Sequence, residues 1–323
     1  MKNYEYYKPQ TINEAIELMG RLDHAQCVAG GTDVMVLVKQ GKLAPSNMIS
    51  LRNIKELRFV DVQSGLKIGA GVTHTEIANN TFIRKHYSAL ADGSGNVGSQ
   101  QIRNVATVGG NVCNAAPSAD TACPLLVLDA KALILGREGT REVPLDEFFL
   151  GPNKVALEAG EIVTGFAMPP FGESTGSAYI KHARRQAMDL PIISIATRVT
   201  LTVKGSEASC KDAFTSSNQR DLTQHLESEN LTFEDVRIAM GVVAPRPIRA
   251  KRAESALKGK VISDALLQKI GEIAVSEASP RDSIRGEAWY RSEMIGVLIK
   301  RAILKSIGRV IRSEDTNVPD RLW

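Results

Sequence analysis

The chain has 323 residues, of which 43% are hydrophobic and 24% charged, and its formal net charge is +4. This length suits two or more domains, each with its own core, and the composition excludes a fibrous or wholly disordered chain. Lysine and arginine are dispersed, so nucleic acid is not an expected partner, and no run approaches the roughly 18 apolar residues of a membrane span.

The cysteines and histidines show no metal-ligand spacing. Cys27, Cys113, Cys123 and Cys210 form no CxxC pair, and the five histidines form no HxxxH or HxH pair. Because clustered spacing identifies most such sites, we expect reduced thiols and neither a metal ion nor an iron–sulfur cluster in this chain. The N-terminal segment has no apolar core or cleavage pattern, which makes the cytoplasm the expected location.

Residues 1–55 are predicted to form a small α/β unit. An apolar run at 25–29 leads into Gly30 and Gly31, and a helix follows. A strand at 48–51 would complete the unit with parallel pairing. The glycine turn would then lie at the carboxyl end of a strand, where such sheets bind ligands.

Residues 56–175 are predicted to form a second unit with antiparallel pairing. Two hairpins are expected, at 57–71 and 132–145, because apolar runs flank short Gly-containing turns. Helices and a second glycine turn lie between these hairpins. Two prolines and the flexible-looking segment FGESTGSA at 171–178 predict the end of the unit.

Residues 176–323 are predicted to form an antiparallel sheet backed by helices. Apolar strands are expected at 192–203 and 236–243, and helices at 263–278 and 286–307. The polar stretch at 204–234 is long for a loop in a compact domain, so we interpret it as a surface insertion.

Two stretches share the chemistry of a phosphate-binding turn. At 27–34 and 101–120, paired glycines stand among small residues and precede a short polar side chain. Consecutive backbone N–H groups in such a turn form a concave donor site for a phosphate. Either turn alone could be a plain connection between a strand and a helix, but two of them favour a dinucleotide.

Six segments resemble, in the same order, segments of the FAD-binding subunit of molybdenum hydroxylases. They are AGGTDV at 29–34, IRNVATVGGN at 102–111, AAPSAD at 115–120, GEIVTGFAMPP at 160–170, GVVAPRPIRA at 241–250 and RGEAWYR at 285–291. The resemblance covers almost the whole chain. The family includes xanthine dehydrogenases, aerobic carbon monoxide dehydrogenases and related dehydrogenases of N-heterocycles and aldehydes, and the stretch from 102 onward is most similar to the FAD-binding subunit of bacterial xanthine dehydrogenases.

The resemblance implies an α+β, two-subdomain FAD-binding fold of the PCMH type. Subdomains 1–55 and 56–175 would clasp FAD, and 176–323 would form a domain similar to the C-terminal domain of carbon monoxide dehydrogenase flavoproteins, with a three-stranded antiparallel sheet and helices. A cysteine-bearing insertion, which holds a [4Fe-4S] cluster in relatives that reduce aromatic thioesters, is missing between Asn111 and Asp120. That subfamily is therefore disfavoured.

The resemblance also implies partners for an oxidoreductase subunit that hydroxylates nothing alone. A large subunit would carry the molybdenum–pterin cofactor and the substrate site, and a small subunit would carry two [2Fe-2S] clusters. Such heterotrimers would pair into a dimer. FAD in this chain would pass electrons from the clusters to NAD or another acceptor.

The family's cofactor contacts map onto two loops and a few single positions. They are Cys27, Val28, Ala29, Gly30, Gly31, Thr32, Asp33 and Val34 in the first loop, Thr107, Gly109, Gly110 and Asn111 in the second, and Val97, Asp120 and Val163 outside them. Asp120 matches a position that binds the ribityl or ribose hydroxyls of the flavin, although it could also cap a helix that begins near Thr121. The two valines could equally be ordinary core residues.

Lys181 matches a lysine that lies near the isoalloxazine ring in the family. A cation there would stabilise the anionic reduced flavin and raise its potential. Alternatively, Lys181, Arg185 and Asp189, which are spaced four apart, could form a solvated ion-pair face.

Two other functions stay open at this point. One is a self-sufficient flavin oxidase with a substrate pocket in the C-terminal domain, although that domain shows no concentrated set of acid and base residues. The other is a non-enzymatic module that binds a nucleotide. Stoichiometric molybdenum and iron in the natural complex would exclude both.

Overall fold

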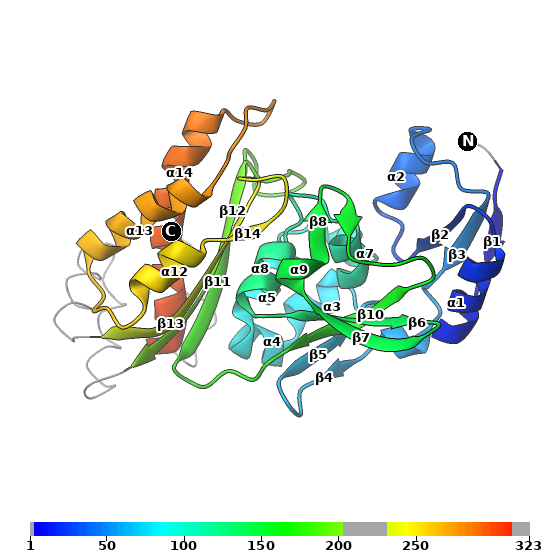
Figure 1. Cartoon of the computed structure of the whole chain (residues 1–323), viewed down its shortest axis with the longest axis horizontal. Coiled ribbons are helices and arrows are strands. Elements are labelled where there is room, and N and C mark those ends of the chain that lie inside the picture. Colours follow the sequence, from blue (N-terminus) through cyan, green and yellow to red (C-terminus); the bar gives the residue numbers. More distant parts are fainter. Residues whose placement is uncertain (1–2, 203–230, 312–323) are drawn as a thin grey trace.

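The computed structural model describes residues 3–202 and 231–311, and three main sheets lie side by side along its long axis (Figure 1). The N-terminal sheet has three parallel strands in the order β1-β3-β2. Its elements are β1 (Glu5–Tyr7), α1 (Ile12–Arg21), β2 (Ala25–Val28), α2 (Val34–Lys39) and β3 (Asn47–Ser50). The predicted parallel pairing and the glycine turn at the carboxyl end of β2 are thus confirmed.

Local sequence explains why α1 forms and where it packs. The Thr11 hydroxyl accepts a hydrogen bond from the Glu14 N–H at 3.2 Å and caps the helix. Ile12, Ala15 and Ile16 are buried on one face, as helical spacing requires. They join the same core as the central sheet.

The central sheet has five strands in the order β4-β5-β10-β6-β7, all paired antiparallel. Its strands are β4 (Val60–Asp61), β5 (Leu66–Gly69), β6 (Lys131–Gly136), β7 (Gly139–Pro144) and β10 (Ile162–Met168). The two predicted hairpins are β4–β5 and β6–β7. They are joined by β10, for which the sequence pattern predicted no strand.

Short helices precede the first hairpin, follow one another between the two hairpins and follow the second. They are η1 (Lys55–Leu57), α3 (His74–Asn79), α4 (Thr81–His86), α5 (Ser88–Gly95), α6 (Gln100–Arg103), α7 (Val108–Cys113), α8 (Ala122–Val127) and α9 (Leu145–Phe148), with the small pair β8 (Phe149–Gly151) and β9 (Lys154–Val155) after them. All six residues of α8 are buried. The helix is therefore stabilised by packing on all sides and has no amphipathic face.

The C-terminal sheet has the order β11-β12-β13-β14 and is backed by helices. Its elements are β11 (Thr175–His182), β12 (Ile193–Thr202), β13 (Thr232–Gly241), β14 (Ile248–Arg249), α12 (Lys251–Leu257), α13 (Asp264–Glu277) and α14 (Ala288–Ile311).

This domain differs from the expectation in three features, and a fourth expectation falls largely outside the described residues. The predicted three-stranded sheet has a fourth strand, β14, whose two residues are too few for a sequence pattern. The helix α12 was also not expected, because Ala250 before it offers no side-chain capping signal. The segment 171–178 is not flexible throughout, because β11 begins at Thr175 and pairs with β12. The polar stretch 204–234 lies largely outside the described residues, and its last residues belong to β13.

A buried ion pair ties the C-terminal domain to the central one. Asp92 of α5 accepts hydrogen bonds from the Arg309 guanidinium of α14 at 2.7 and 2.8 Å. Burial alone would raise the pKa of Asp92, but the charges of Arg309 and Lys305 and the hydrogen bonds it accepts outweigh burial and lower that pKa. The Tyr179 N–H also donates to Asp92 at 3.1 Å, so the pair positions β11 beside α5.

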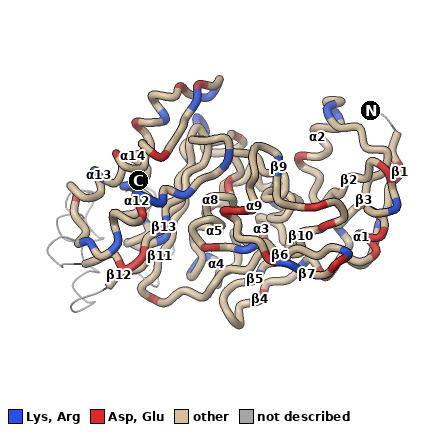
Figure 2. Tube along the Cα trace, viewed as in Figure 1, with Lys and Arg blue, Asp and Glu red and all other residues tan. Residues whose placement is uncertain are grey.

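Charged residues of both signs are interspersed along the trace of all three sheets (Figure 2). Among the residues that the structure describes, none of the helices combines the length and the apolar character that crossing a bilayer would need.

Candidate cofactor-binding site

The two glycine loops, which are far apart in the sequence, meet in the structure. A Cβ atom on Gly30 of the first loop would come within 2.1 Å of the Val105 carbonyl oxygen at the start of the second. Gly31 has a φ of 73°, a left-handed conformation that favours glycine. Gly109 packs on the central sheet, where a Cβ atom would lie 2.6 Å from that of Ala70. The backbone path of both loops therefore requires these glycines.

Hydrogen bonds hold the second loop in place. The Thr107 hydroxyl accepts a hydrogen bond from the Gly110 N–H at 3.1 Å, which begins α7. The side-chain oxygen of Asn111 accepts a hydrogen bond from the Thr121 hydroxyl at 2.6 Å. The NH₂ group of Asn111 is then the part of this side chain left to donate.

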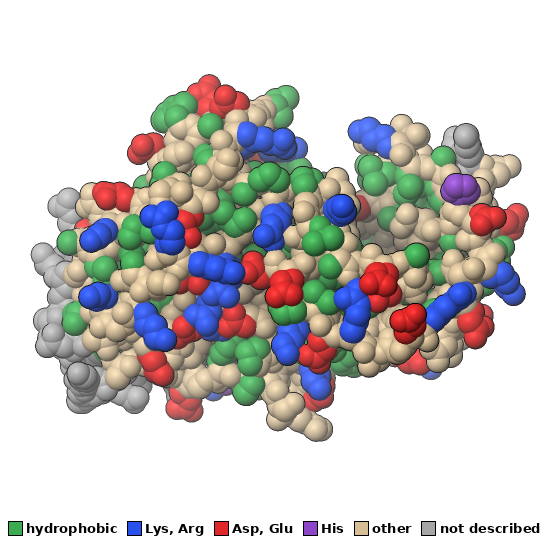
Figure 3. All heavy atoms as spheres, in the orientation of Figure 1, with side chains coloured by type: hydrophobic (Ala, Val, Ile, Leu, Met, Phe, Trp, Pro, Cys, Tyr) green, Lys and Arg blue, Asp and Glu red, His purple; other side chains and the backbone are tan. Residues whose placement is uncertain are grey.

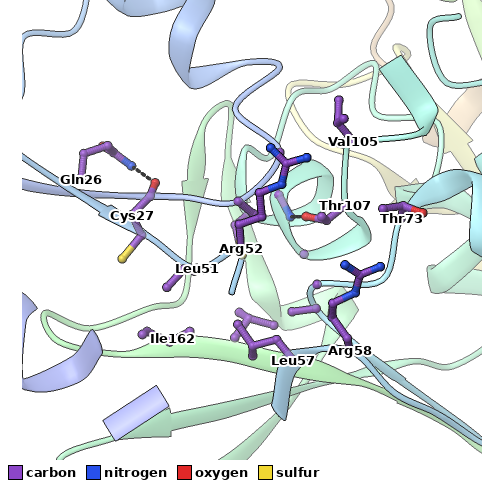
Figure 4. A pocket seen from close by; sticks show the side chains of 18 of the residues that line it. Gln26, Cys27, Leu51, Arg52, Leu57, Arg58, Thr73, Val105, Thr107 and Ile162 are labelled. Atoms are coloured by element: carbon purple, nitrogen blue, oxygen red, sulfur yellow. Dashed lines mark hydrogen bonds between the residues drawn. The ribbon is translucent and has the colours of Figure 1, made fainter. Parts of the chain in front are cut away.

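A cavity opens on each side of the two loops. The smaller, of about 390 Å³, lies between the loops, the end of β3 and the central sheet (Figure 4). The larger, of about 690 Å³, lies between the loops, α2 and the C-terminal domain. In Figure 3 the surface is notched between α2 and the loop before α14, and Leu37 and Arg285 of these two segments line the larger cavity.

The same loop residues line both cavities. They are Gln26, Cys27, Ala29, Gly30, Thr107, Gly110 and Cys113. A diphosphate held by the N–H groups of the loops would thus have space for one nucleoside on each side. Both volumes fall within the roughly 300–1,000 Å³ of typical cofactor pockets, so the site fits a dinucleotide.

Most of the predicted contact residues line one or both cavities. These are Cys27, Ala29, Gly30, Gly31, Thr32, Asp33, Val34, Val97, Thr107, Gly109, Gly110, Asn111, Asp120 and Val163. Val28 and Lys181 line neither of them. The Val28 side chain packs in a small core with Val38 and Met48, and Lys181 lies behind Asp120.

Asp120 is held by two side chains from β11. Its carboxylate accepts a hydrogen bond from the Tyr179 hydroxyl at 2.7 Å and forms an ion pair with Lys181 Nζ at 2.9 Å. Burial raises the pKa of Asp120, and the charge of Lys181 and the two hydrogen bonds only partly counteract it. The alternative role as a helix cap is wrong, because α8 has Thr121 as its N-cap residue and no side-chain cap bond.

Lys181 does not belong to a solvated ion-pair face. Its side chain is 8% exposed, and Nζ also donates a hydrogen bond to the Asn96 carbonyl oxygen at 3.0 Å. Asp189 instead lies 3.7 Å from Arg184 Nε and 3.9 Å from Arg185 Nε, two exposed side chains. Lys181 therefore contacts Asp120, which lines the larger cavity, and does not line that cavity itself.

Several residues around the cavities were not predicted as contacts, although Ile102, Glu161 and Arg285 lie within the segments that resemble the family. In the larger cavity these are Leu37, His74, Ile102, Arg184, Met188 and Arg285, and in the smaller cavity Leu51, Arg52, Leu57, Arg58 and Glu161. They come from eight separate segments of all three sheets, so no spacing within one motif relates them. Only the folded chain brings them together.

Several buried ionisable groups at the site are neutral near pH 7. Burial raises the pKa of Cys27 and Cys113 to about 12. Burial and the charge of Arg103 lower the pKa of His74 to about 4. Within 3–202 and 231–311, no three His, Cys, Asp or Glu side chains are arranged to hold a metal ion.

Comparison with protein families agrees with this geometry. Residues 2–171 match the model described as "FAD binding domain in molybdopterin dehydrogenase", and residues 178–306 match "CO dehydrogenase flavoprotein C-terminal domain". The chain belongs to the FAD-binding medium subunits of molybdenum hydroxylases. FAD is therefore the cofactor of this medium subunit, and the subunit works in an oxidoreductase.

Individual relatives are similar over nearly their whole length. The medium subunit is 33% identical over 305 residues to the xanthine dehydrogenase FAD-binding subunit of Escherichia coli O157:H7, which covers 94% of this chain and 95% of the relative. It superposes on a chain of carbon monoxide dehydrogenase from Hydrogenophaga pseudoflava with a TM-score of 0.83 at 28% identity, covering 95% and 98% of the two chains. For quinoline 2-oxidoreductase from Pseudomonas putida 86, the TM-score is 0.82 at 26% identity, covering 96% and 100%. The expected family and fold class are thus confirmed, and neither the flavin oxidase nor the non-enzymatic module finds support.

Proposed function

We propose that the two glycine loops bind the diphosphate of FAD, with the adenosine half in the smaller cavity and the flavin half in the larger. The isoalloxazine ring with its ribityl chain needs more space than adenosine does. The larger cavity also contains the Asp120 carboxylate, which suits ribityl hydroxyls. The observation that carries this proposal is the meeting of both loops between two cavities.

In this arrangement, the chain's own residues bind and orient the cofactor. The N–H groups of the loops and the NH₂ group of Asn111 donate to phosphate oxygens. Asp120, already bonded by Tyr179 and Lys181, accepts hydrogen bonds from hydroxyl groups on its cavity side. When bound, FAD supplies a redox group that links one-electron carriers to a two-electron acceptor.

The electrons come from outside this chain. We propose that a small subunit with two [2Fe-2S] clusters delivers them, that a large subunit with a molybdenum–pterin cofactor converts the substrate, and that NAD accepts the electrons. The names of the relatives support this arrangement, because they include medium chains and FAD-binding subunits of dehydrogenases. A dimer of heterotrimers and a cytoplasmic location stay predictions.

The substrate class is inferred from the xanthine dehydrogenase subunits among the relatives. The 33% identity to a xanthine dehydrogenase subunit supports a purine or similar N-heterocycle. Medium chains of carbon monoxide dehydrogenase are also similar, so the fold of this subunit is compatible with substrates of different chemistry. The large subunit would select the substrate.

The complex with its natural partners tests this function. We expect one FAD per medium subunit, stoichiometric molybdenum and iron, and reduction of the flavin by a purine substrate only when all subunits are present. The isolated chain should bind FAD. Dithionite should reduce this bound FAD, whereas a purine should not. Substrate-dependent oxygen consumption by the metal-free isolated chain would instead show a flavin oxidase.

A further inference from the structure

Arg52 stands at the edge of the smaller cavity, directly after β3. The Leu51 N–H donates a hydrogen bond to the Val28 carbonyl oxygen at 2.8 Å, so the backbone here is pinned beside the strand that leads into the first glycine loop. Arg52 therefore lies at the carboxyl end of the parallel sheet. In Figure 4 its side chain extends toward the loop that contains Thr107.

The other charged groups of this cavity already have partners. The Glu161 carboxylate receives two hydrogen bonds from the Arg141 guanidinium, each 2.6 Å long. The Arg58 guanidinium donates to the Glu76 carboxylate at 2.9 Å. Within the part of the chain that the structure describes, the Arg52 guanidinium has neither an ion pair nor a hydrogen bond. Its charge is thus available to a ligand.

The loop residues between the two cavities lack a full positive charge. The seven residues that line both cavities are uncharged at neutral pH, so none of them brings a cation to a diphosphate with about two negative charges. An arginine close to a diphosphate forms short, charge-assisted and often bidentate hydrogen bonds. The extended Arg52 side chain, at the rim of a cavity whose other charged groups already have partners, suits this task.

We propose that Arg52 is a cationic clamp that closes over the smaller cavity and binds the diphosphate of FAD from the adenosine side. This inference rests on the proposed placement of the diphosphate at the glycine loops. Its ligand chemistry is that of an ADP moiety. The clamp adds affinity for ADP and FAD and none for a flavin without phosphate.

The cofactor-free full-length chain, titrated with FAD, ADP and riboflavin by calorimetry, tests the clamp. Arg52→Gln should weaken the binding of FAD and ADP by about 10- to 100-fold, since a hydrogen bond to a charged group is lost. Arg52→Lys keeps the charge but not the planar, forked guanidinium, so its loss of affinity for FAD and ADP should be smaller than that of Arg52→Gln. The affinity of Arg52→Gln for ADP should also fall less steeply with added salt than that of the natural chain.

Lys55→Gln is the matched control. It removes the same charge three residues further on, from the exposed start of η1, and Lys55 lines neither cavity. We expect natural affinities for all three ligands and unchanged melting temperatures for every variant.

The outcomes separate this inference from the proposed function. The clamp is overturned if Arg52→Gln binds ADP with the affinity of the natural chain. It is also overturned if the affinity for riboflavin falls by the same factor as the affinity for ADP. In both cases the proposed binding of FAD stands. A natural chain that binds neither FAD nor ADP overturns both the placement of the cofactor and the clamp.

Discussion

The two sides of the proposed FAD site are built in different ways. The glycine-loop side uses backbone N–H groups, and its side chains are small because the loops approach each other closely, as at Gly30 and Val105. The side facing the C-terminal domain uses side chains, with Asp120 held by Tyr179 and Lys181 across a domain boundary. A backbone site is encoded within a few consecutive residues, whereas a side-chain site is assembled from distant ones.

The strongest test of the backbone side is Gly30→Val. Its new side chain would collide with the backbone at Val105, so we expect near-complete loss of FAD and a destabilisation of at least about 4 kcal/mol. FAD content after purification and urea denaturation measure both effects. Gly172→Ala is the control, because a Cβ atom there meets nothing within 4 Å, and it should change stability by less than about 0.5 kcal/mol. Retention of FAD by Gly30→Val would show that the loops need not touch.

On the side-chain side, Asp120→Asn should destabilise the fold by about 2 kcal/mol. The Lys181 ammonium, 8% exposed at its side chain, would keep a neutral hydrogen-bond acceptor but lose its counter-charge. Urea denaturation measures the loss, and adding Lys181→Met to Asp120→Asn should recover part of it. Glu142→Gln, which removes an exposed ion pair with Lys131, should cost under about 1 kcal/mol. Equal losses in the two variants would contradict a special role for the buried pair.

The junction between the two sides should be sensitive to acid. The pKa of Asp92 is lowered in the folded state, so its contribution to stability is present above the pKa of an unfolded aspartate, about 3.9, and is lost as pH falls through the lower, folded value. The free energy of unfolding should therefore decrease below about pH 4. Denaturation at several pH values measures this decrease. Asp92→Asn should make the decrease shallower, and an unchanged pH profile would show that Asp92 does not contribute.

The smallest expected effect concerns the flavin itself. Lys181→Met should lower the flavin potential by about 30 mV or less, which corresponds to about 1.4 kcal/mol for a two-electron couple. The shift is small because Lys181 reaches the larger cavity only through Asp120. A redox titration of the FAD-loaded complex measures it, with Lys55→Gln as the control. An unchanged potential would show that Lys181 is only a structural partner of Asp120.

Several local features of the fold could be predicted from the sequence. Paired glycines after an apolar run predicted the turn after β2, and turn residues between apolar runs predicted both hairpins of the central sheet. Helical spacing predicted α13 and α14 to within a few residues. These features depend on neighbours in the chain, so a local pattern carries them.

The amino-acid sequence alone thus determined two glycine turns, the parallel and antiparallel character of the units and, through resemblance, the FAD-binding family. Tertiary structure alone decided that β10 joins the two hairpins, that Asp120 pairs with Lys181 and does not cap α8, and that Arg52 faces a cavity. Asp120 and Lys181 lie 2.9 Å apart in space but on different elements. Such contacts depend on how sheets pack against each other, and no local spacing specifies that packing.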